Sequence, residues 1–263
     1  MADCCLSELA EKIEAVVKEA GRILINAVRV EETVEEKSGR ANFVTAYDKR
    51  VQDFLFQKLM KILPDAVFIG EEEEEHAALP EGYAFIIDPI DGTTNFMKGY
   101  CVSCISVGLL QAGKPVLGIV YNPYLDELFR AEKGKGAYCN GKAIHVSDHD
   151  LSEGLVLFGT APYNEELSKR SFQCAYELFI RSLDVRRSGS AAIDLCNVAC
   201  GRAELYFELL LSPWDYAAGS LILTEAGGRI VNTEGKEITF DEKNGVVAGN
   251  EKTIKVWQEI QKA

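Results

Sequence analysis

The spacing of apolar residues changes along this 263-residue chain, and that change restricts the fold more than any other feature. Apolar residues recur at helical intervals over residues 6–27, which predicts a long amphipathic helix ending near Val30. Thr45 and Asp48 are spaced as a capping box, so a second helix is expected up to the break at Pro64. The apolar runs after this point are short and typical of strands.

Consecutive strands are predicted by the runs AVFIG, YAFIID, CISVGLL, PVLGIVY and ELFRAE. The pair Asn140-Gly141 predicts a hairpin turn. After about residue 150, strand-like runs alternate with helical ones, with helices expected near 164–181, from Ser190, from Asp215 and at the end. We therefore expect a mixed α/β fold. Its N-terminal α+β half (1–149) and C-terminal α/β half (150–263) should form one compact unit with a cleft between them.

Acidic residues outnumber basic ones, 41 against 28, which gives a formal net charge of −13. The averaged field of such a protein repels phosphate backbones, so nucleic acid is not an expected partner. An acidic protein that handles a small anion must invert its local field. Bound divalent cations are the simplest way to do this.

The N-terminal sequence lacks the basic and apolar regions of a signal peptide, and no apolar run is long enough to cross a membrane. The eight cysteines lie scattered in apolar segments, which favours a reduced, cytoplasmic protein. Cys101 and Cys104 form a lone C-x-x-C inside a strand-like run, where metal binding is not expected. The histidines are expected to be surface residues without a catalytic role: His76, His145 and His149.

The segment YAFIIDPIDGTTNF carries the clearest chemical signal, because a buried-type strand runs directly into Asp88. Pro89 stiffens the turn, so the carboxylates of Asp88 and Asp91 can converge on one side. Gly92 permits a close approach of the backbone. The N–H groups of Gly92 and Thr93, at the start of an expected helix, would form a phosphate cradle.

Two further carboxylates stand at the ends of predicted elements, Glu71 after a strand and Asp215 at a helix start. Each acid has an ordinary interpretation by itself. Asp88 can be a strand end, Asp91 part of a plain turn, Glu71 one member of the acidic run 71–75, and Asp215 a first-turn acid that favours the helix dipole. Together they would concentrate negative charge that two or more divalent ions must neutralise, and oxygen-only ligands favour Mg²⁺ over Zn²⁺.

The segments IGEE, DPIDGTTNF and WDYAAGSLILTEAGG, in this order and at this spacing, resemble the inositol monophosphatase family of Mg²⁺-dependent, lithium-sensitive phosphatases. The resemblance extends to residues 37–48, to GKPVLGIVYNP and to RRSGSAAIDLC. It implies a layered αβαβα sandwich of the kind shared with fructose-1,6-bisphosphatase. It also implies a homodimer, with the active site between the two halves of each chain.

The resemblance implies a first Mg²⁺ held by Glu71, Asp88 and the carbonyl of Ile90. A second would be held by Asp88, Asp91 and Asp215, and a third, weaker ion would lie near Glu71.

Gly92 and Thr93 would bind the phosphate. The positions implied for the alcohol half of the substrate are Asp91, Gly189, Ser190, Ala191, Glu208 and Asp215.

The implied reaction is direct, in-line attack of a metal-activated water on a phosphate monoester without a covalent phosphoenzyme. Thr93 together with Glu71 would orient and deprotonate the water, and Asp48 would add a carboxylate to this relay. Asp91 would also be essential, because it serves both a metal ion and the substrate.

The expected function is Mg²⁺-dependent hydrolysis of inositol monophosphate. The expected binding partner is a small phosphorylated polyol or sugar substrate, and no association with a membrane is expected. Tyr47, Lys98 and the pair Ser212-Pro213 depart from the commonest family pattern around the cleft, which leaves the substrate preference open. Arg186 and Arg187 could accept a second phosphate or form ordinary surface pairs.

The alternatives within the superfamily are a fructose-1,6-bisphosphatase, a dual inositol and fructose phosphatase, and a 3′-phosphoadenosine 5′-phosphate phosphatase. An alternative from another class is a catalytically inactive metal-binding scaffold. The matching carboxylates and Thr93 argue against the last of these, since loss of catalysis would normally remove one of them.

Overall fold

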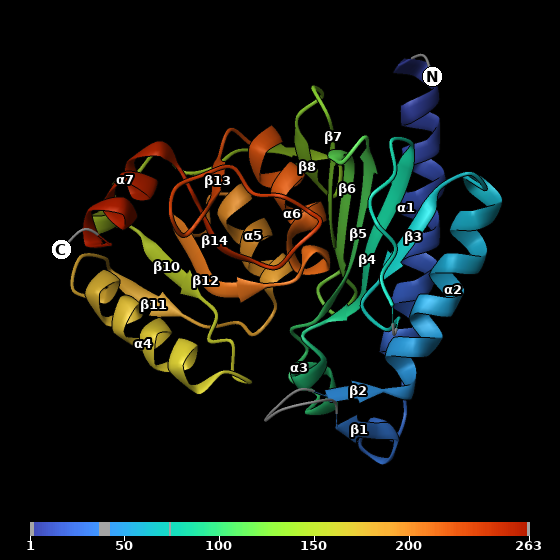
Figure 1. Cartoon of the computed structure of the whole chain (residues 1–263), viewed down its shortest axis with the longest axis horizontal. Helices are drawn as coiled ribbons and strands as arrows, with labels where there is room; N and C mark the ends of the chain where they lie inside the picture. The colour runs from blue at the N-terminus through green and yellow to red at the C-terminus, as the bar shows by residue number, and fades with distance from the viewer. Residues whose placement is uncertain (1–2, 37–42, 74, 262–263) are drawn as a thin grey trace.

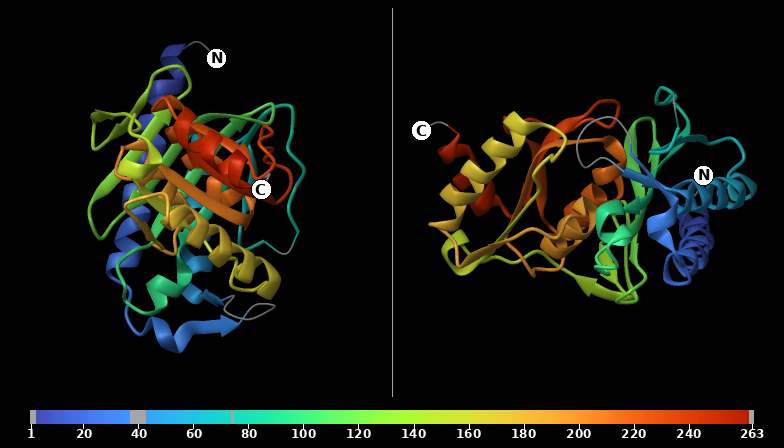
Figure 2. Two further views of the ribbon diagram at one scale, coloured as in Figure 1. Left: turned by 90° about the vertical axis from the view of Figure 1, so that its left-hand side faces the viewer. Right: turned by 90° about the horizontal axis from the view of Figure 1, so that it is seen from below.

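The computed structural model describes residues 3–36, 43–73 and 75–261, so part of the segment 37–48 lies outside the described residues. Figure 1 shows two sheets that alternate with helical layers, and Figure 2 shows the same layers from two further directions. This arrangement confirms the expected layered αβαβα sandwich. No helix among the described residues is both long and apolar enough to span a membrane.

Helices α1 (Asp3–Ile25) and α2 (Ala46–Ile62) form the outer layer beside the N-terminal sheet (Figure 1). Both are confirmed where the spacing of apolar residues predicted them, and their apolar faces share one core with that sheet. Helix α1 ends earlier than the expected Val30. The left-handed conformation of Arg29 (φ 52°) follows it, and then a short 3-10 helix, η1 (Val30–Thr33). A small antiparallel ribbon follows, made of β1 (Val34–Glu36) and β2 (Phe43–Thr45).

A seven-stranded sheet in the order β3-β4-β5-β6-β7-β8-β9 forms the next layer. Its strands are β3 (Val67–Gly70), β4 (Tyr83–Asp91), β5 (Cys104–Gln111), β6 (Lys114–Asn122), β7 (Glu127–Glu132), β8 (Ala137–Cys139) and β9 (Lys142–Ile144). Strands β3 and β4 are parallel, and the other neighbours are antiparallel. The predicted hairpin is confirmed, because Asn140 and Gly141 both have positive φ between β8 and β9.

Strand β4 differs from the sequence prediction in one respect that matters for the site. The strand was expected to end where the apolar run stops, at Asp88. Instead β4 continues to Asp91, with a register shift between these two residues. Pro89 has no N–H group to donate to a sheet ladder, so the strand bulges there instead of pairing regularly. The bulge places two carboxylates at the end of a buried strand.

The C-terminal sheet has five strands in the order β11-β10-β12-β14-β13. These strands are β10 (Leu155–Phe158), β11 (Asp184–Arg186), β12 (Leu205–Leu211), β13 (Arg229–Asn232) and β14 (Asn244–Gly249). Strand β10 is parallel to both of its neighbours, whereas β14 is antiparallel to both of its own. A 3-10 turn, η2 (Leu151–Glu153), precedes β10. Helices α4 (Glu165–Phe179) and α7 (Glu251–Ile260) cover the outer face of this sheet (Figure 1).

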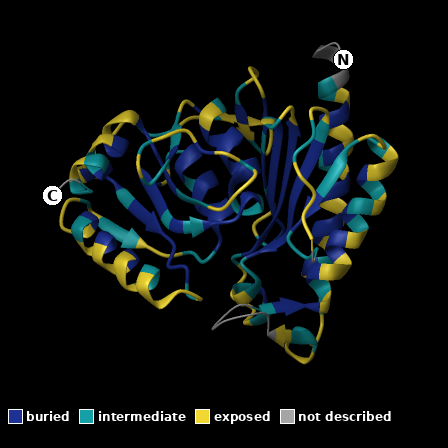
Figure 3. Cartoon of the chain, viewed as in Figure 1, coloured by how far each residue is buried: buried dark blue, intermediate teal, exposed yellow. Residues whose placement is uncertain are grey.

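Helices α5 (Ala191–Ala199) and α6 (Pro213–Glu225) lie between the two sheets (Figure 1). They are largely buried, as Figure 3 shows, because both faces of each helix are apolar. Helix α6 packs directly on the N-terminal sheet. A Cβ added at Gly118 would lie only 2.5 Å from the carbonyl oxygen of Ala218, so a glycine is needed for this close contact.

The cysteines with described side chains form no disulfide in the structure: Cys101, Cys104, Cys139, Cys174, Cys196 and Cys200. The histidines of the chain are exposed, also as expected.

Candidate active site

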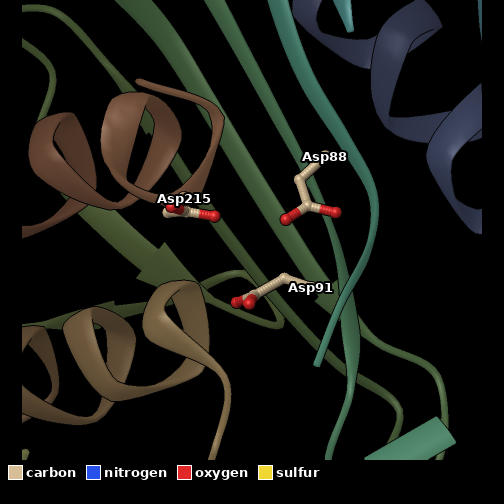
Figure 4. Close-up of side chains that lie close together, drawn as sticks. All are labelled: Asp88, Asp91 and Asp215. Carbon is tan, nitrogen blue, oxygen red and sulfur yellow. The ribbon is translucent and has the colours of Figure 1, made fainter. Parts of the chain in front are cut away.

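Three carboxylates from the two halves of the chain meet between the sheets. Asp88 and Asp91 lie at the end of β4, and Asp215 lies in the first turn of α6. One carboxylate oxygen from each acid lies within 4.8 Å of the corresponding oxygens of the other two, and Figure 4 shows the three side chains close together. The structure therefore brings together three of the four acids that the sequence singled out, with Glu71 lining the cavity beside them.

The crowding of these acids changes their protonation. Burial, followed by repulsion from Glu71 and Asp91, raises the pKa of Asp88 well above its usual range. Burial and the charges of Asp91 and Glu71 raise the pKa of Asp215 in the same way. Burial also raises the pKa of Asp91, to about 6, although several hydrogen bonds oppose the change. An acidic cluster of this kind lacks positive charge, which a divalent cation would supply.

Asp91 is held by the N-terminus of α5. Its Oδ2 accepts hydrogen bonds from the Ser190 hydroxyl (2.6 Å) and from the N–H of Ala192 (2.7 Å). Its Oδ1 accepts a longer bond from the N–H of Ala191 (3.3 Å). The positive end of the helix dipole favours a carboxylate there. The Asp91 side chain thus joins the N-terminal sheet to the helical layer of the other half.

Asp215 is positioned by a local signal. Ser212 caps α6, and its backbone N–H donates to Asp215 Oδ2 at 2.7 Å, which completes a capping box. Pro213 occupies the first helical position, where its missing N–H costs nothing. Asp215 is therefore both part of the cap of α6 and a member of the acidic cluster.

A cavity of about 260 Å³ opens beside the acidic cluster. Most of the residues singled out from the sequence line it: Glu71, Asp91, Gly92, Thr93, Gly189, Ser190, Ala191, Glu208 and Asp215. Asp88, Ile90 and Asp48 lie behind this lining and are buried.

Asp48 and Ile90 both contact Thr93. The Thr93 hydroxyl lies 3.2 Å from Asp48 Oδ1 and 3.1 Å from the carbonyl oxygen of Ile90, and both atoms can accept its proton. The other oxygen of Asp48 accepts from the N–H (2.8 Å) and the hydroxyl (2.6 Å) of Thr45, so the predicted capping box is present. Burial raises the pKa of Asp48 to about 6.

Gly92 caps the short helix α3 (Thr93–Met97), which begins where the sequence predicted a helix start. Its φ of 92° lies in the left-handed region, and a Cβ there would lie 2.9 Å from the carbonyl oxygen of Val102. Glycine is therefore required. The first N–H groups of a helix have no partner inside it, so they are available to an anion in the cavity.

Glu208 projects from β12 into a space that Gly159 leaves open. A Cβ on Gly159 would lie only 1.9 Å from Glu208 Oε2. The carboxylate accepts hydrogen bonds from the N–H of Ala161 (3.0 Å) and from the hydroxyl of Tyr206 (2.9 Å). Burial raises the pKa of Glu208. This acid lines the cavity from the C-terminal sheet.

The two arginines considered for a second phosphate have different positions. Arg187 lines the cavity, and its Nε donates to the Thr160 hydroxyl at 3.2 Å. Arg186 is exposed on the edge strand β11, where it forms an ion pair with Asp184. Only the first of them can reach a ligand in the cavity.

Sequence reasoning missed some residues at the site. Tyr163 and Asp194 line the cavity. Asp194 is 2% exposed, and its Oδ1 has no hydrogen-bond partner among the described residues. Sequence reasoning also missed a contact outside this cavity. His76 Nε2 lies 3.0 Å from the carbonyl oxygen of Gly70 and its ring lies 4.7 Å from that of Trp214, so it joins the loop after β3 to the start of α6. No local spacing in the sequence signals the positions of these three residues.

Carboxylate oxygens beside a helix N-terminus suit a divalent cation next to a bound phosphate, which is the combination that a metal-dependent phosphatase uses. The donor set contains oxygen atoms only, which suits Mg²⁺.

Comparison with known proteins identifies the family. The sequence model of the Inositol monophosphatase family matches residues 6–262. Inositol monophosphatase 2 of Solanum lycopersicum is 39% identical over 241 residues, which cover 88% of this chain and 90% of that protein. Inositol-1-monophosphatase of Bacillus subtilis is 34% identical over 247 residues, covering 93% and 92%. The solved structure of an IMPase from Thermotoga maritima matches with a TM-score of 0.87 at 31% identity, covering 97% of this chain and 96% of that one. The chain belongs to the inositol monophosphatase family and is a phosphatase.

Proposed function

We propose that the protein hydrolyses the monophosphate ester of inositol in a Mg²⁺-dependent reaction. The observation that carries this proposal is the cluster of Asp88, Asp91 and Asp215, two of which line a cavity that Gly92 and Thr93 at the N-terminus of α3 also line. The cavity has room and polar groups for a small phosphorylated polyol. The names of the relatives support inositol as the alcohol.

The carboxylates divide into two ligand sets in this proposal. Glu71, Asp88 and the Ile90 carbonyl would hold one Mg²⁺, and Asp88, Asp91 and Asp215 would hold another. A third ion would lie near Glu71. Bound Mg²⁺ supplies positive charge, polarises the phosphate and lowers the pKa of water. The raised pKa values of Asp88 and Asp215 support this proposal, because clustered buried carboxylates need a nearby positive charge to remain ionised.

Thr93 and Asp48 would act on the attacking water. The Thr93 hydroxyl donates its proton toward Asp48 or Ile90, which leaves its lone pairs able to accept a hydrogen bond from water in the cavity. Glu71 would accept the proton, with Asp48 behind Thr93 as a further carboxylate of the relay. The N–H groups of Gly92 and Thr93 would hold the phosphate oxygens. In this scheme the chain supplies no covalent nucleophile.

The alcohol half of the substrate would lie toward the C-terminal half of the chain. Glu208 and Asp91 offer acceptors for its hydroxyl groups. The other groups proposed to contact it are Gly189, Ser190, Ala191 and Asp215. We also infer that residues 1–149 and 150–263 are the two halves that meet at this site, that the protein works as a cytoplasmic homodimer, and that it is sensitive to lithium.

The proposed function is tested by phosphate release with and without Mg²⁺ from inositol 1-phosphate, fructose 1,6-bisphosphate and 3′-phosphoadenosine 5′-phosphate. We expect Mg²⁺-dependent release with a clear preference for the inositol ester. Preference for either other ester would replace the proposed substrate. Tight Mg²⁺ binding without release from any phosphate ester would instead support a metal-binding scaffold.

Arg187 provides a test of the dual-substrate alternative. Replacing Arg187 with Gln should lower kcat/KM for fructose 1,6-bisphosphate by about tenfold relative to inositol 1-phosphate, since a charge-assisted hydrogen bond to the second phosphate would be lost. The matched control is Arg186→Gln, whose side chain does not line the cavity and which should leave the ratio unchanged. Equal losses on both esters in Arg187→Gln would contradict a second phosphate site at this residue.

A further inference from the structure

Tyr163 is the aromatic side chain that the loop between β10 and α4 presents to the cavity. Tyr163 lines the cavity and is 41% exposed as a residue, and its hydroxyl donates to the carbonyl oxygen of Leu210 at 3.3 Å. Pro162, which precedes it in the chain, and Leu211, at the end of β12, also line the cavity. The lining of the cavity thus includes apolar groups as well as the carboxylates of the acidic cluster.

The position of the ring relative to the charged groups is also informative. Burial, followed by repulsion from Asp215, Glu208 and Glu71, raises the pKa of Tyr163, so its hydroxyl stays protonated as a donor. The hydroxyl therefore lies within the field of both the acidic cluster and Glu208. Tyr163 lines the same cavity as Asp91, Asp215 and Glu208, so a substrate that reaches from the acidic cluster to Glu208 occupies the space that this ring lines.

The loop that carries Tyr163 is fixed at several points. Ala161 has a left-handed φ of 41°, unusual for a residue with a Cβ, and its N–H donates to Glu208 at 3.0 Å. The Asn164 N–H donates to the Ala161 carbonyl at 2.9 Å, and the Ser168 hydroxyl donates to the Thr160 carbonyl at 2.8 Å. The backbone of the loop is therefore held in place before a ligand arrives, and the bond from the Tyr163 hydroxyl to Leu210 restrains the side chain, which lowers the entropy cost of binding.

We propose that Tyr163 is a specificity-determining residue whose ring stacks against the C–H face of a cyclic polyol or sugar phosphate. This inference rests on the proposed function and narrows its substrate class. A cyclic polyol presents an apolar C–H face as well as hydroxyl edges. The cavity matches both, with an aromatic face for the first and Glu208 and Asp91 as acceptors for the second. An acyclic alcohol has no comparable rigid face and gains little from the ring.

The test compares inositol 1-phosphate with glycerol 2-phosphate, which are both monoesters of secondary alcohols, one cyclic and one acyclic. Tyr163→Leu should lower kcat/KM about tenfold for the inositol ester and less than threefold for the glycerol ester. Most of the loss should fall on KM, because stacking on a spectator ring is equally strong in the ground state and the transition state. Tyr163→Phe keeps the ring and should retain the selectivity of the wild type.

Two controls separate stacking from a structural role. The Mg²⁺ concentration for half-maximal binding, measured by calorimetry, should not change in Tyr163→Leu, since the residue is no metal ligand in this proposal. Tyr176→Leu removes an exposed tyrosine of α4 that does not line the cavity, and it should leave both esters unaffected.

The outcomes distinguish this inference from the proposed function. Equal losses on both esters, weakened Mg²⁺ binding or unchanged selectivity in Tyr163→Leu would overturn the role of Tyr163 while leaving the phosphatase assignment intact. A wild-type protein that hydrolyses neither ester would overturn both.

Discussion

Asp91→Asn is expected to lower kcat/KM by about three orders of magnitude or more, which corresponds to about 4 kcal/mol or more of transition-state stabilisation. Asp91 serves both the proposed second metal ion and the substrate, and a neutral amide is a poor ligand for Mg²⁺ beside Asp88 and Asp215. The measurement is steady-state phosphate release, together with Mg²⁺ titration by calorimetry. We expect weaker metal binding as well as lost turnover.

The fold should survive this substitution. An asparagine at this position keeps an oxygen that can accept from Ser190 and Ala192, and it removes one of several like charges from a buried cluster. The matched control is Glu132→Gln, a buried carboxylate of β7 that is bonded to Ser7 and Arg130 and lies outside the cavity. The control should retain turnover. Near-normal turnover in Asp91→Asn would refute the proposed role of Asp91.

The metal-free protein is expected to lose stability as the pH rises from 4 to above 6, and Mg²⁺ should restore it at pH 8. Asp48 and Asp91 have folded-state pKa values of about 6 against an unperturbed 3.8. Between these values the folded state holds protons that the unfolded chain has released. The free energy of unfolding therefore falls with rising pH through this interval. The contribution is fully present below pH 3.8 and is lost above about 6.

At low pH, the raised pKa of each of these two acids contributes about 3 kcal/mol to the free energy of unfolding. Between pH 5 and pH 8 each acid loses about 1.4 kcal/mol of this contribution, about 3 kcal/mol for the two. For a chain of this size, that loss should lower Tm by about 6 to 12 °C in the presence of a chelator. Thermal unfolding in 0.3 M KCl, which screens surface charges, measures the effect. Millimolar Mg²⁺ at pH 8 should reverse it, whereas KCl of equal ionic strength should not. Asp91→Asn should show a smaller drop.

A Tm that rises or stays constant from pH 5 to pH 8 without metal would show that the carboxylates are not buried as a like-charged cluster. The same experiment on the control Glu132→Gln should give the full drop, because the pKa of Glu132 is lowered by Arg130 rather than raised.

The local signals in the sequence predicted the elements that carry the site. The capping box of Thr45 and Asp48, the helix start after Gly92 and the hairpin at Asn140-Gly141 each depend on residues within one turn of one another. Such signals are encoded by short-range hydrogen bonds and backbone preferences. The one error along β4 arose at Pro89, since a bulge depends on the pairing strand as well as on the proline.

The long-range contacts of the site could not be predicted in this way. The bonds from Ser190 and Ala192 to Asp91 join residues about a hundred positions apart. The sequence treated Arg186 and Arg187 alike, but only Arg187 lines the cavity. Contacts of this kind depend on how the two sheets pack on α5 and α6, and residue spacing along the chain carries no information about that packing.

The sequence by itself determined the order of the elements, the layered α/β class and the identity of the acids that can hold a metal, because periodicity, caps and strand ends are local properties. Only the tertiary structure decided which side chains share the cavity. It placed Asp91 on the N-terminus of α5, Tyr163 in the same cavity as Glu208, and His76 on Trp214. The physical reason is that burial and the fields of neighbouring charges are set by the packing of distant segments, and these determine how the site binds and reacts.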